Sequence, residues 1–155
     1  MSETIVKIVD FNDHFTEIEE IRTRVFIKEQ NVPVELEWDE FDNDSTHILA
    51  YYNNKPVGTA RLLNDGHIGR MAVLKEYRNR KIGENMLKYI LDIAKKRSIE
   101  NLELSAQEHA VDFYKKYGFS VTSDVYMDAG IPHYTMIYSG SIIKDNKKTS
   151  TKTIR

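Results

Sequence analysis

The sequence of 155 residues lacks three features that would place it in a specialised class of protein. It has no cysteine, which excludes disulfides, thiolate zinc sites and a cysteine nucleophile, and which fits a reducing, cytoplasmic location. It has no run of about 18 apolar residues, so no membrane span is expected. Its N-terminus has no apolar stretch of the length that signal peptides contain.

The sequence also lacks an excess of either charge. The formal net charge is −2 and the isoelectric point is near 6.2, so a nucleic-acid partner is not expected. Hydrophobic residues make up 41% and charged residues 30%, which is typical of a globular chain. We therefore expect one domain over residues 1–140. Residues 141–155 hold five cations, one acid and no hydrophobic periodicity, which predicts a disordered basic tail.

What the sequence does have is an uneven distribution of charge. Residues 28–44 contain one cation and seven acids, whereas residues 75–97 contain eight cations and three acids. Runs of this kind are most often solvated surfaces. They also allow a second interpretation, in which one small domain binds two ligands of different charge.

Hydrophobic periodicity predicts alternating strands and helices. Apolar residues at three- and four-residue spacing predict one helix that includes Phe15 and Phe26, a second over about 79–97, and a short third over 110–117. Pro33 is expected to stop the first helix or its continuation. This order predicts an α/β (α+β) fold, in which a mixed, mostly antiparallel sheet of six to seven strands has helices on both faces. The expected strands cover 4–9, 48–52, 57–63, 67–73, 102–104, 119–126 and 134–138.

The strongest local feature is the strand over 67–73 followed by a short link and a helix start. The turn from Arg78 to Gly83 places three cations beside the free amides and the positive dipole end of the helix. That arrangement suits a bound pyrophosphate. An ordinary solvated helix start with basic neighbours would give the same pattern.

A second feature follows it along the chain and reveals a family resemblance. Ala110 and Tyr114 are four residues apart on one helix face, and Gly118-Phe119 returns the chain to the sheet. Gly118 is expected to end this helix in a left-handed conformation that favours glycine. Together the two features resemble the GCN5-related N-acetyltransferase (GNAT) superfamily, whose acetyl-CoA signature is (Gln/Arg)-x-x-Gly-x-(Gly/Ala). Arg78 to Gly83 matches this signature with one departure, because Lys81 stands where the first glycine is usual. The resemblance covers about residues 4–140 and implies the GNAT fold.

Two further segments resemble small bacterial GNAT proteins labelled YjcF-like or ElaA-like. They are Val25-Phe26-Ile27-Lys28-Glu29-Gln30-Asn31-Val32-Pro33 and Ala129-Gly130-Ile131-Pro132-His133. The middle and C-terminal half also resembles glyphosate N-acetyltransferase, which has a lysine at the place of Lys81. A non-glycine residue with positive φ there would cost about 1 kcal/mol, which an ammonium near phosphate can offset.

The resemblance implies direct transfer of acetyl from acetyl-CoA to a primary amine, with no metal. The strand Met71-Ala72-Val73 would pair with the pantetheine and polarise the thioester carbonyl, and the following turn would hold the pyrophosphate. The implied cofactor-binding residues are Met71, Ala72, Val73, Arg78, Asn79, Arg80, Lys81, Ile82, Gly83 and Glu84.

Two side chains are implied to move protons. Tyr114 stands where many members place the acid that protonates the departing thiolate, although it could instead pack at a helix end. His133 aligns with the histidine base of glyphosate N-acetyltransferase, and histidine accepts a proton near neutral pH. His133 could also only anchor a loop. The alternative bases, and implied acceptor-binding residues, are Glu29, Glu35 and Glu37.

The acceptor is expected to be a small cationic or neutral amine. The arginines with which the glyphosate enzyme holds its anionic substrate are replaced here by Ile27, Gly69 and Gln107, and residues 28–44 are acidic. Two other interpretations remain open: acetylation of a protein or peptide, and a non-catalytic module that binds acyl-CoA. A homodimer is compatible with the family resemblance.

Overall fold

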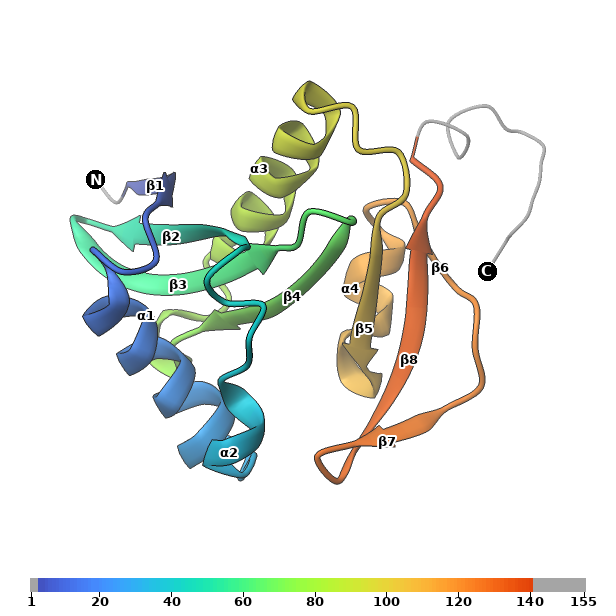
Figure 1. The fold of residues 1–155 in the computed structure, drawn as a ribbon, viewed down its shortest axis with the longest axis horizontal. Helices are drawn as coiled ribbons and strands as arrows, with labels where there is room; N and C mark the ends of the chain where they lie inside the picture. Colours follow the sequence, from blue (N-terminus) through green and yellow to red (C-terminus); the bar gives the residue numbers. More distant parts are fainter. Residues whose placement is uncertain (1–2, 141–155) are drawn as a thin grey trace. The chain divides into compact units, whose positions relative to one another are not determined.

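The computed structural model describes residues 3–140, which divide into two compact units with a boundary between Glu100 and Asn101. The expected disordered tail over 141–155 lies outside the described residues. The first unit holds the elements from β1 to α3 and the second those from β5 to β8 (Figure 1). Within residues 3–140, no helix combines the length and the apolar character needed to cross a membrane.

The first unit is built on four antiparallel strands in the order β1-β2-β3-β4. Helices and helical turns connect or follow these strands. The strands are β1 (Thr4–Val9), β2 (Thr46–Tyr52), β3 (Lys55–Leu62) and β4 (His67–Val73). The helical segments are α1 (Phe15–Arg22), the π-helix η1 (Thr23–Glu29), α2 (Val34–Glu37), the 3₁₀ turn η2 (Lys75–Tyr77) and α3 (Ile82–Lys96).

Helices cover both faces of this sheet. Successive side chains of a strand point to opposite faces, and the last six residues of β3, Val57 to Leu62, are all buried. Both α1 and α3 contact β3, and they lie on opposite sides of it in Figure 1. The prediction of helices on both faces is therefore confirmed for this unit.

The helix α3 lies close to the sheet because β3 has a glycine where they meet. A methyl group on Gly58 would lie 3.1 Å from Met86 Cε and 3.3 Å from the Ala72 carbonyl oxygen. The buried side of α3 follows the predicted helical spacing. Its buried members are Ile82, Met86, Leu87, Ile90, Ile93 and Ala94.

The second unit is a small antiparallel sheet centred on β8 (Ile131–Tyr138). This strand pairs with β5 (Glu103–Gln107), β6 (Phe119–Val121) and β7 (Tyr126–Asp128). The 3₁₀ turn η3 (Glu108–Ala110) and helix α4 (Val111–Lys115) join β5 to β6. Gly118 ends this helical region with φ +98°, a conformation that favours glycine, as the sequence predicted.

The described residues contain eight strands, where six to seven were expected. The difference arises because the expected strand over 119–126 is two separate strands, β6 and β7. The first helix also departs from expectation, since it changes to π-helical bonding at Thr23, and α2 follows Pro33 where only a stop was expected. Periodicity locates apolar faces but does not distinguish α-helical from π-helical bonding.

Candidate functional site

The loop between β4 and α3 has the backbone conformation of an anion-binding turn. Asn79 and Lys81 both have left-handed backbones, with φ of 66° and 64°. Lys81 is the N-cap of α3, and within residues 3–140 no side chain forms a capping hydrogen bond at this helix start. The first amides of a helix have no partner within it and carry the positive end of the dipole. The residues present therefore fit a phosphate-bearing group at this helix start.

Lys81 occupies the left-handed position at which the family signature has glycine, so replacing it with glycine should stabilise the fold. We expect Lys81→Gly to raise the free energy of unfolding by about 1 kcal/mol, because a Cβ is unfavourable at this φ. That gain corresponds to about 2–4 °C in melting temperature for a chain of this size.

The variant Lys81→Ala is the matched control for this prediction, because it loses the ammonium but keeps the Cβ. Its melting temperature should stay close to that of the unmodified protein, and both variants should bind CoA more weakly. An unchanged melting temperature for Lys81→Gly would contradict the strain argument.

Arg78, the first residue of the signature, forms a bidentate ion pair with Glu29. Its two terminal nitrogens lie 2.6 and 2.7 Å from the Glu29 carboxylate oxygens, and its Nε donates to the Val73 carbonyl at 2.9 Å. The hydrogen bond from Arg78 holds the pKa of Glu29 below its usual value. The structure thus joins a residue expected at the cofactor to one expected at the acceptor.

Glu29 also borders an open pocket of about 640 Å³ between η1 and η2. The walls carry charges of both signs, including an ion pair of 2.6 Å between Arg24 and Glu76. The lining residues are Arg24, Val25, Lys28, Glu29, Leu74, Lys75 and Glu76.

Arg80 is held against two tyrosine rings rather than by a carboxylate. Its guanidinium lies 5.0 Å from the ring centre of Tyr52 and 5.5 Å from that of Tyr77, and it donates to the Tyr52 hydroxyl at 3.1 Å. Cation–π contacts of this kind attract a guanidinium without neutralising its charge. Arg80 therefore keeps its positive charge beside the start of α3.

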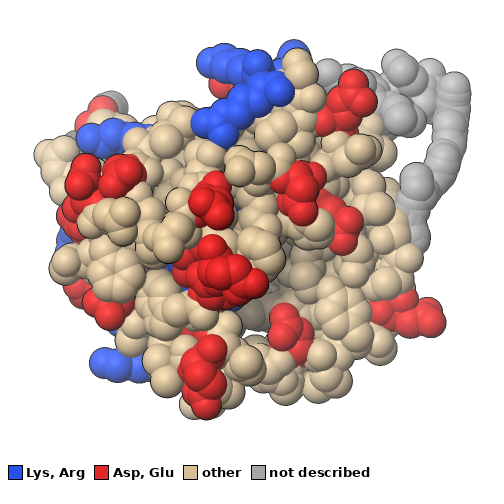
Figure 2. Space-filling model, in the orientation of Figure 1, with Lys and Arg blue, Asp and Glu red and all other residues tan. Residues whose placement is uncertain are grey.

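The other cations of the basic segment are spread along α3. Lys88 and Lys96 pair with Glu84 and Asp92 one turn earlier. Lys95, Lys96 and Arg97 lie at the far end of the helix, where basic side chains gather at the top of Figure 2. Since 15 residues of α-helix span about 22 Å, these cations are remote from the β4–α3 loop.

The strand β4 contains a bulge at Arg70 and Met71, where the predicted cofactor-facing residues begin. Thr59 pairs with Ala72 and Arg61 with Gly69, so the single residue Ala60 on β3 lies opposite both Arg70 and Met71. Arg70 has φ 49°, which is unusual for a residue with a side chain. A bulge of this kind bends a strand locally and is common beside functional sites.

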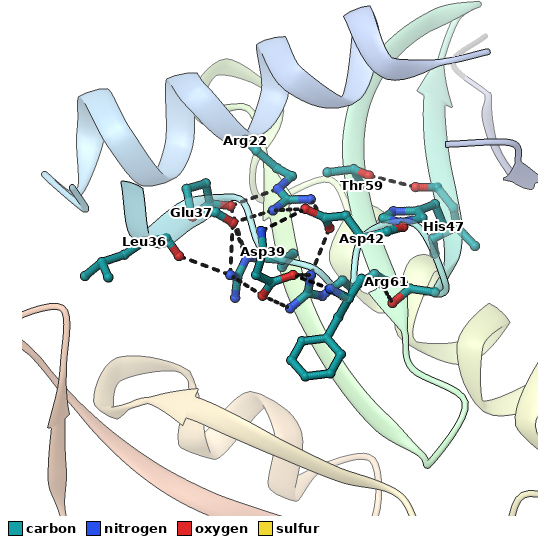
Figure 3. A network of polar contacts seen from close by, with 12 residues as sticks. Arg22, Leu36, Glu37, Asp39, Asp42, His47, Thr59 and Arg61 are labelled. Atoms are coloured by element: carbon teal, nitrogen blue, oxygen red, sulfur yellow. Dashed lines mark hydrogen bonds and ion pairs between the residues drawn. The ribbon is translucent and has the colours of Figure 1, made fainter. Parts of the chain in front are cut away.

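A network of three arginines and three carboxylates lies between α1, α2 with the loop after it, and the strands β3 and β4 (Figure 3). Four of its side chains are buried, whereas those of Asp39 and Arg70 are about a quarter exposed. Arg22 donates to Glu37 and to Asp42, each at 2.8 Å. Arg61 donates to Asp39 at 2.7 Å and to Asp42 at 2.8 Å. Formal charges cancel over the network, whose members are Arg22, Arg61, Arg70, Glu37, Asp39 and Asp42.

Aromatic rings and a histidine complete this network. The Arg22 guanidinium lies 4.2 Å from the ring centre of Trp38. The buried His47 is hydrogen-bonded through Nε2 to the Asp42 carbonyl at 2.7 Å and stacks on Phe11 at 4.5 Å. Burial lowers the pKa of His47, which favours the neutral ring.

Because of this network, part of the acidic segment over residues 28–44 is not free to contact a ligand in the way that the sequence suggested. Three of its seven acids neutralise buried arginines, and Glu29 pairs with Arg78. Glu37 is 3% exposed and points into the network, whereas Glu35 is exposed on α2. Direct contact of Glu29, Glu35 or Glu37 with an acceptor remains a prediction.

Sequence reasoning missed these arginines although a signal was present. Arg22 lies four residues after Ile18 and three before Val25, on the apolar stripe of the predicted helix. Arg61 lies within an otherwise buried apolar strand. A cation at such a position must be paired, so an acidic partner could have been sought in the nearby acidic segment.

In the second unit, Tyr114 lies on α4 within an aromatic cluster. Its ring makes edge contacts with Phe113 at 5.1 Å and Phe119 at 5.9 Å between ring centres. Burial raises the pKa of Tyr114 to about 12. The hydroxyl is therefore protonated throughout the physiological range, as a proton donor must be.

His133 lies on β8 and is 8% exposed. Its Nδ1 is 2.7 Å from the Ile131 carbonyl oxygen, and its ring stacks on Tyr126. A neutral ring that donates from Nδ1 has its lone pair on Nε2, the arrangement that a base needs. The same hydrogen bond would also anchor the turn, so both interpretations of His133 are compatible with its geometry.

Comparisons with known proteins place this architecture in a family. The family model described as an acetyltransferase (GNAT) domain matches residues 12–139. The chain is 43% identical over 121 residues to the uncharacterized N-acetyltransferase YjcF of Bacillus subtilis, covering 76% of this chain and 86% of that protein.

Solved structures have the same fold. Escherichia coli ElaA superposes with a TM-score of 0.78 at 28% identity, covering 87% of this chain and 99% of that one. Arabidopsis thaliana Naa50, solved with the bisubstrate analogue CoA-Ac-MVNAL, superposes with a TM-score of 0.70 at 25% identity, covering 88% and 98%. The chain therefore belongs to the GNAT acetyltransferase family, whose members transfer an acyl group from acyl-CoA to an amine nitrogen.

Proposed function

We propose that the protein transfers acetyl from acetyl-CoA directly to the primary amine of a small cationic or neutral molecule. The observation that carries the proposal is the β4–α3 loop, with left-handed backbones at Asn79 and Lys81 and an uncapped helix start. Arg80 and Lys81 add positive charge beside those amides. These residues would hold the pyrophosphate, and acetyl-CoA would supply the thioester carbon that the amine attacks.

The residues of this chain would then stabilise charge and move protons. A bond forms between the amine nitrogen and the carbonyl carbon while the carbon–sulfur bond breaks. Amides of the Met71–Val73 strand would stabilise the negative charge that develops on the carbonyl oxygen. The amine proton would pass to His133, or through water to Glu29 or Glu35, and Tyr114 would donate its proton to the departing thiolate.

The exposed side chains around α2 support an acceptor that combines a positive or neutral amine with an apolar part. Four acids of residues 28–44 lie outside the network and are exposed: Glu29, which pairs with Arg78, and Glu35, Glu40 and Asp44. Acidic side chains cover the loop after α2 in Figure 2. Exposed apolar side chains lie among them at Val34, Leu36 and Phe41.

A peptide N-terminus is the second candidate acceptor. It is favoured by the similarity to Naa50, whose structure contains CoA joined to an acetylated peptide. A peptide has a backbone beyond its first residue, which a small amine lacks. Contacts with that backbone would raise the affinity of the protein for a peptide acceptor.

The test is a thermal-shift titration with acetyl-CoA, CoA and ATP, followed by free-thiol release with a panel of amines. Acetyl-CoA at a hundred times its Kd should stabilise the protein by about 2.7 kcal/mol, or several degrees. The panel should include a diamine, an arylalkylamine with no other charged group, an amino acid with a free carboxylate, and a short peptide. We expect the first two to release thiol fastest.

Each alternative predicts a different result in the same assay. Faster release with the peptide would replace the small amine with a peptide acceptor. A different result would indicate a module that binds acyl-CoA without catalysis. In that case acetyl-CoA raises the melting temperature, no amine causes thiol release, and His133→Ala does not change the rate of thiol release. The absence of any shift at millimolar acetyl-CoA would contradict the proposal itself.

A further inference from the structure

Arg70 joins two parts of the first unit that are far apart in the sequence. Its backbone forms the bulge of β4 together with that of Met71, where the strand Met71–Val73 begins. Its side chain reaches the end of α2, more than thirty residues earlier, and donates to the Glu37 carbonyl at 2.9 Å and to the Leu36 carbonyl at 3.3 Å. The acceptor carbonyl of Leu36 is visible at the left of the network in Figure 3.

The acceptors of Arg70 are those that most need a donor. The last carbonyls of a helix have no partner within it, and α2 has only four residues. Arg70 also binds two carboxylates, with Nε 3.2 Å from Glu37 Oε2 and Nη2 3.1 Å from Asp39 Oδ2. A planar guanidinium can make all these contacts at once, whereas an ammonium cannot.

A second arginine fixes the same carbonyl from another direction. Arg22 of α1 donates to the Glu37 carbonyl at 2.7 Å. The end of α2 is therefore tied both to a helix and to the bulged strand. Arg61 differs from both, because it donates to the side chains of Asp39 and Asp42.

The backbone of Arg70 is strained, and its contacts explain how the strain persists. A non-glycine residue at φ 49° has a sparsely populated, strained backbone conformation. Such a conformation is stable only when its surroundings determine it. Here the side chain of the strained residue makes the contacts that hold the bulge in place.

We infer that Arg70 is a positioning residue, whose guanidinium holds the β4 bulge in one geometry by fixing it to the end of α2. This inference rests on the proposed function, in which the strand that begins at the bulge aligns the thioester carbonyl. Arg70 itself need not touch either substrate. Losing its contacts should misalign the strand without removing the phosphate loop.

The test compares Arg70→Lys with Arg61→Lys. Each variant keeps the charge of the network but replaces one planar guanidinium with an ammonium, at a different position. Three quantities are measured: kcat with the best amine, the Kd for CoA, and hydrogen exchange of the amides of residues 70–73. For Arg70→Lys we expect kcat to fall by about ten- to a hundredfold, since a displacement near 1 Å can cost that much. The Kd for CoA should change less than about threefold.

Arg61→Lys should lower stability but leave kcat within about twofold of the unmodified protein. Exchange at residues 70–73 should rise about tenfold in Arg70→Lys only, because the bulge opens locally. Equal losses of kcat in both variants, or unchanged exchange in Arg70→Lys, would overturn the inference. If the unmodified protein transfers acetyl to no amine, the proposed function fails, and the exchange comparison alone decides whether Arg70 holds the bulge.

Discussion

Replacing Asp42 with asparagine is expected to lower the free energy of unfolding by about 3–5 kcal/mol, because breaking one partner of a buried ion pair leaves uncompensated charge. Asp42 accepts hydrogen bonds from Arg22 and Arg61, both at 2.8 Å, and all three side chains are at least 94% buried. Within the described residues, the Arg61 Nε is buried without a hydrogen-bond partner, so this guanidinium already has one unsatisfied donor. This decrease in the free energy of unfolding is measured by urea titration, with circular dichroism as the signal of unfolding.

Glu35→Gln provides the matched control, since Glu35 belongs to the same acidic segment but is exposed. A surface change of this kind should alter the free energy of unfolding by less than about 0.5 kcal/mol. A loss below about 1 kcal/mol for Asp42→Asn would show that the network contributes little.

The same network should make stability depend on pH in the acid range. The hydrogen bond from Arg61 lowers the pKa of Asp39. Burial alone would raise the pKa of Asp42, but hydrogen bonds and charges from Arg22 and Arg61 outweigh it, so this pKa is also lowered. A carboxylate with a lowered pKa stabilises the fold fully above the unfolded value near 3.9 and loses this effect as pH falls through the folded value. Below about pH 4, the free energy of unfolding of the unmodified protein should fall more steeply with decreasing pH than that of Asp42→Asn.

Replacing Tyr114 with phenylalanine is expected to lower kcat by about a hundredfold while leaving the Kd for acetyl-CoA unchanged. General acid catalysis contributes about 10²- to 10⁴-fold, and a thiol leaving group with pKa near 8.5 needs less assistance than most. The low end of that range therefore applies. Because burial raises the pKa of Tyr114 to about 12, its ionisation should not limit kcat at neutral or mildly alkaline pH.

Tyr117→Phe is the matched control for this prediction. Tyr117 follows the same helix and its ring lies 5.3 Å from that of Phe113, so its replacement tests the loss of a hydroxyl from the same aromatic cluster. We expect its kcat to stay within about twofold of the unmodified protein. If both substitutions changed kcat equally, or if Tyr114→Phe left kcat unchanged, Tyr114 would not be the general acid.

Much of the fold could be predicted from local sequence. The strand His67–Val73 was expected with its observed bounds, and the positive φ of Gly118 followed from the helix end before it. The start of α3 was placed three residues too early, because left-handed backbones at Asn79 and Lys81 precede the helix and neither residue is glycine.

The buried network could not be predicted in the same way, because its partners come from four separate elements. Arg22 and Asp42 are 20 residues apart, and Arg61 and Asp39 are 22 apart. Charge counted along the chain therefore suggested an acidic surface where the folded protein has a neutral cluster. Local patterns report which residues share a face of one element, but not which charges from different elements meet.

The division of residues 34–44 into buried and exposed side chains also determines how this protein can be altered. Glu37, Asp39 and Asp42 each have arginine partners from other elements, so a change at one of them succeeds only with a compensating change elsewhere. Their exposed neighbours carry no such constraint. A library intended to shift acceptor preference should therefore randomise the exposed positions and keep the three arginine-paired acids fixed. The positions to randomise are Val34, Glu35, Leu36, Glu40 and Phe41.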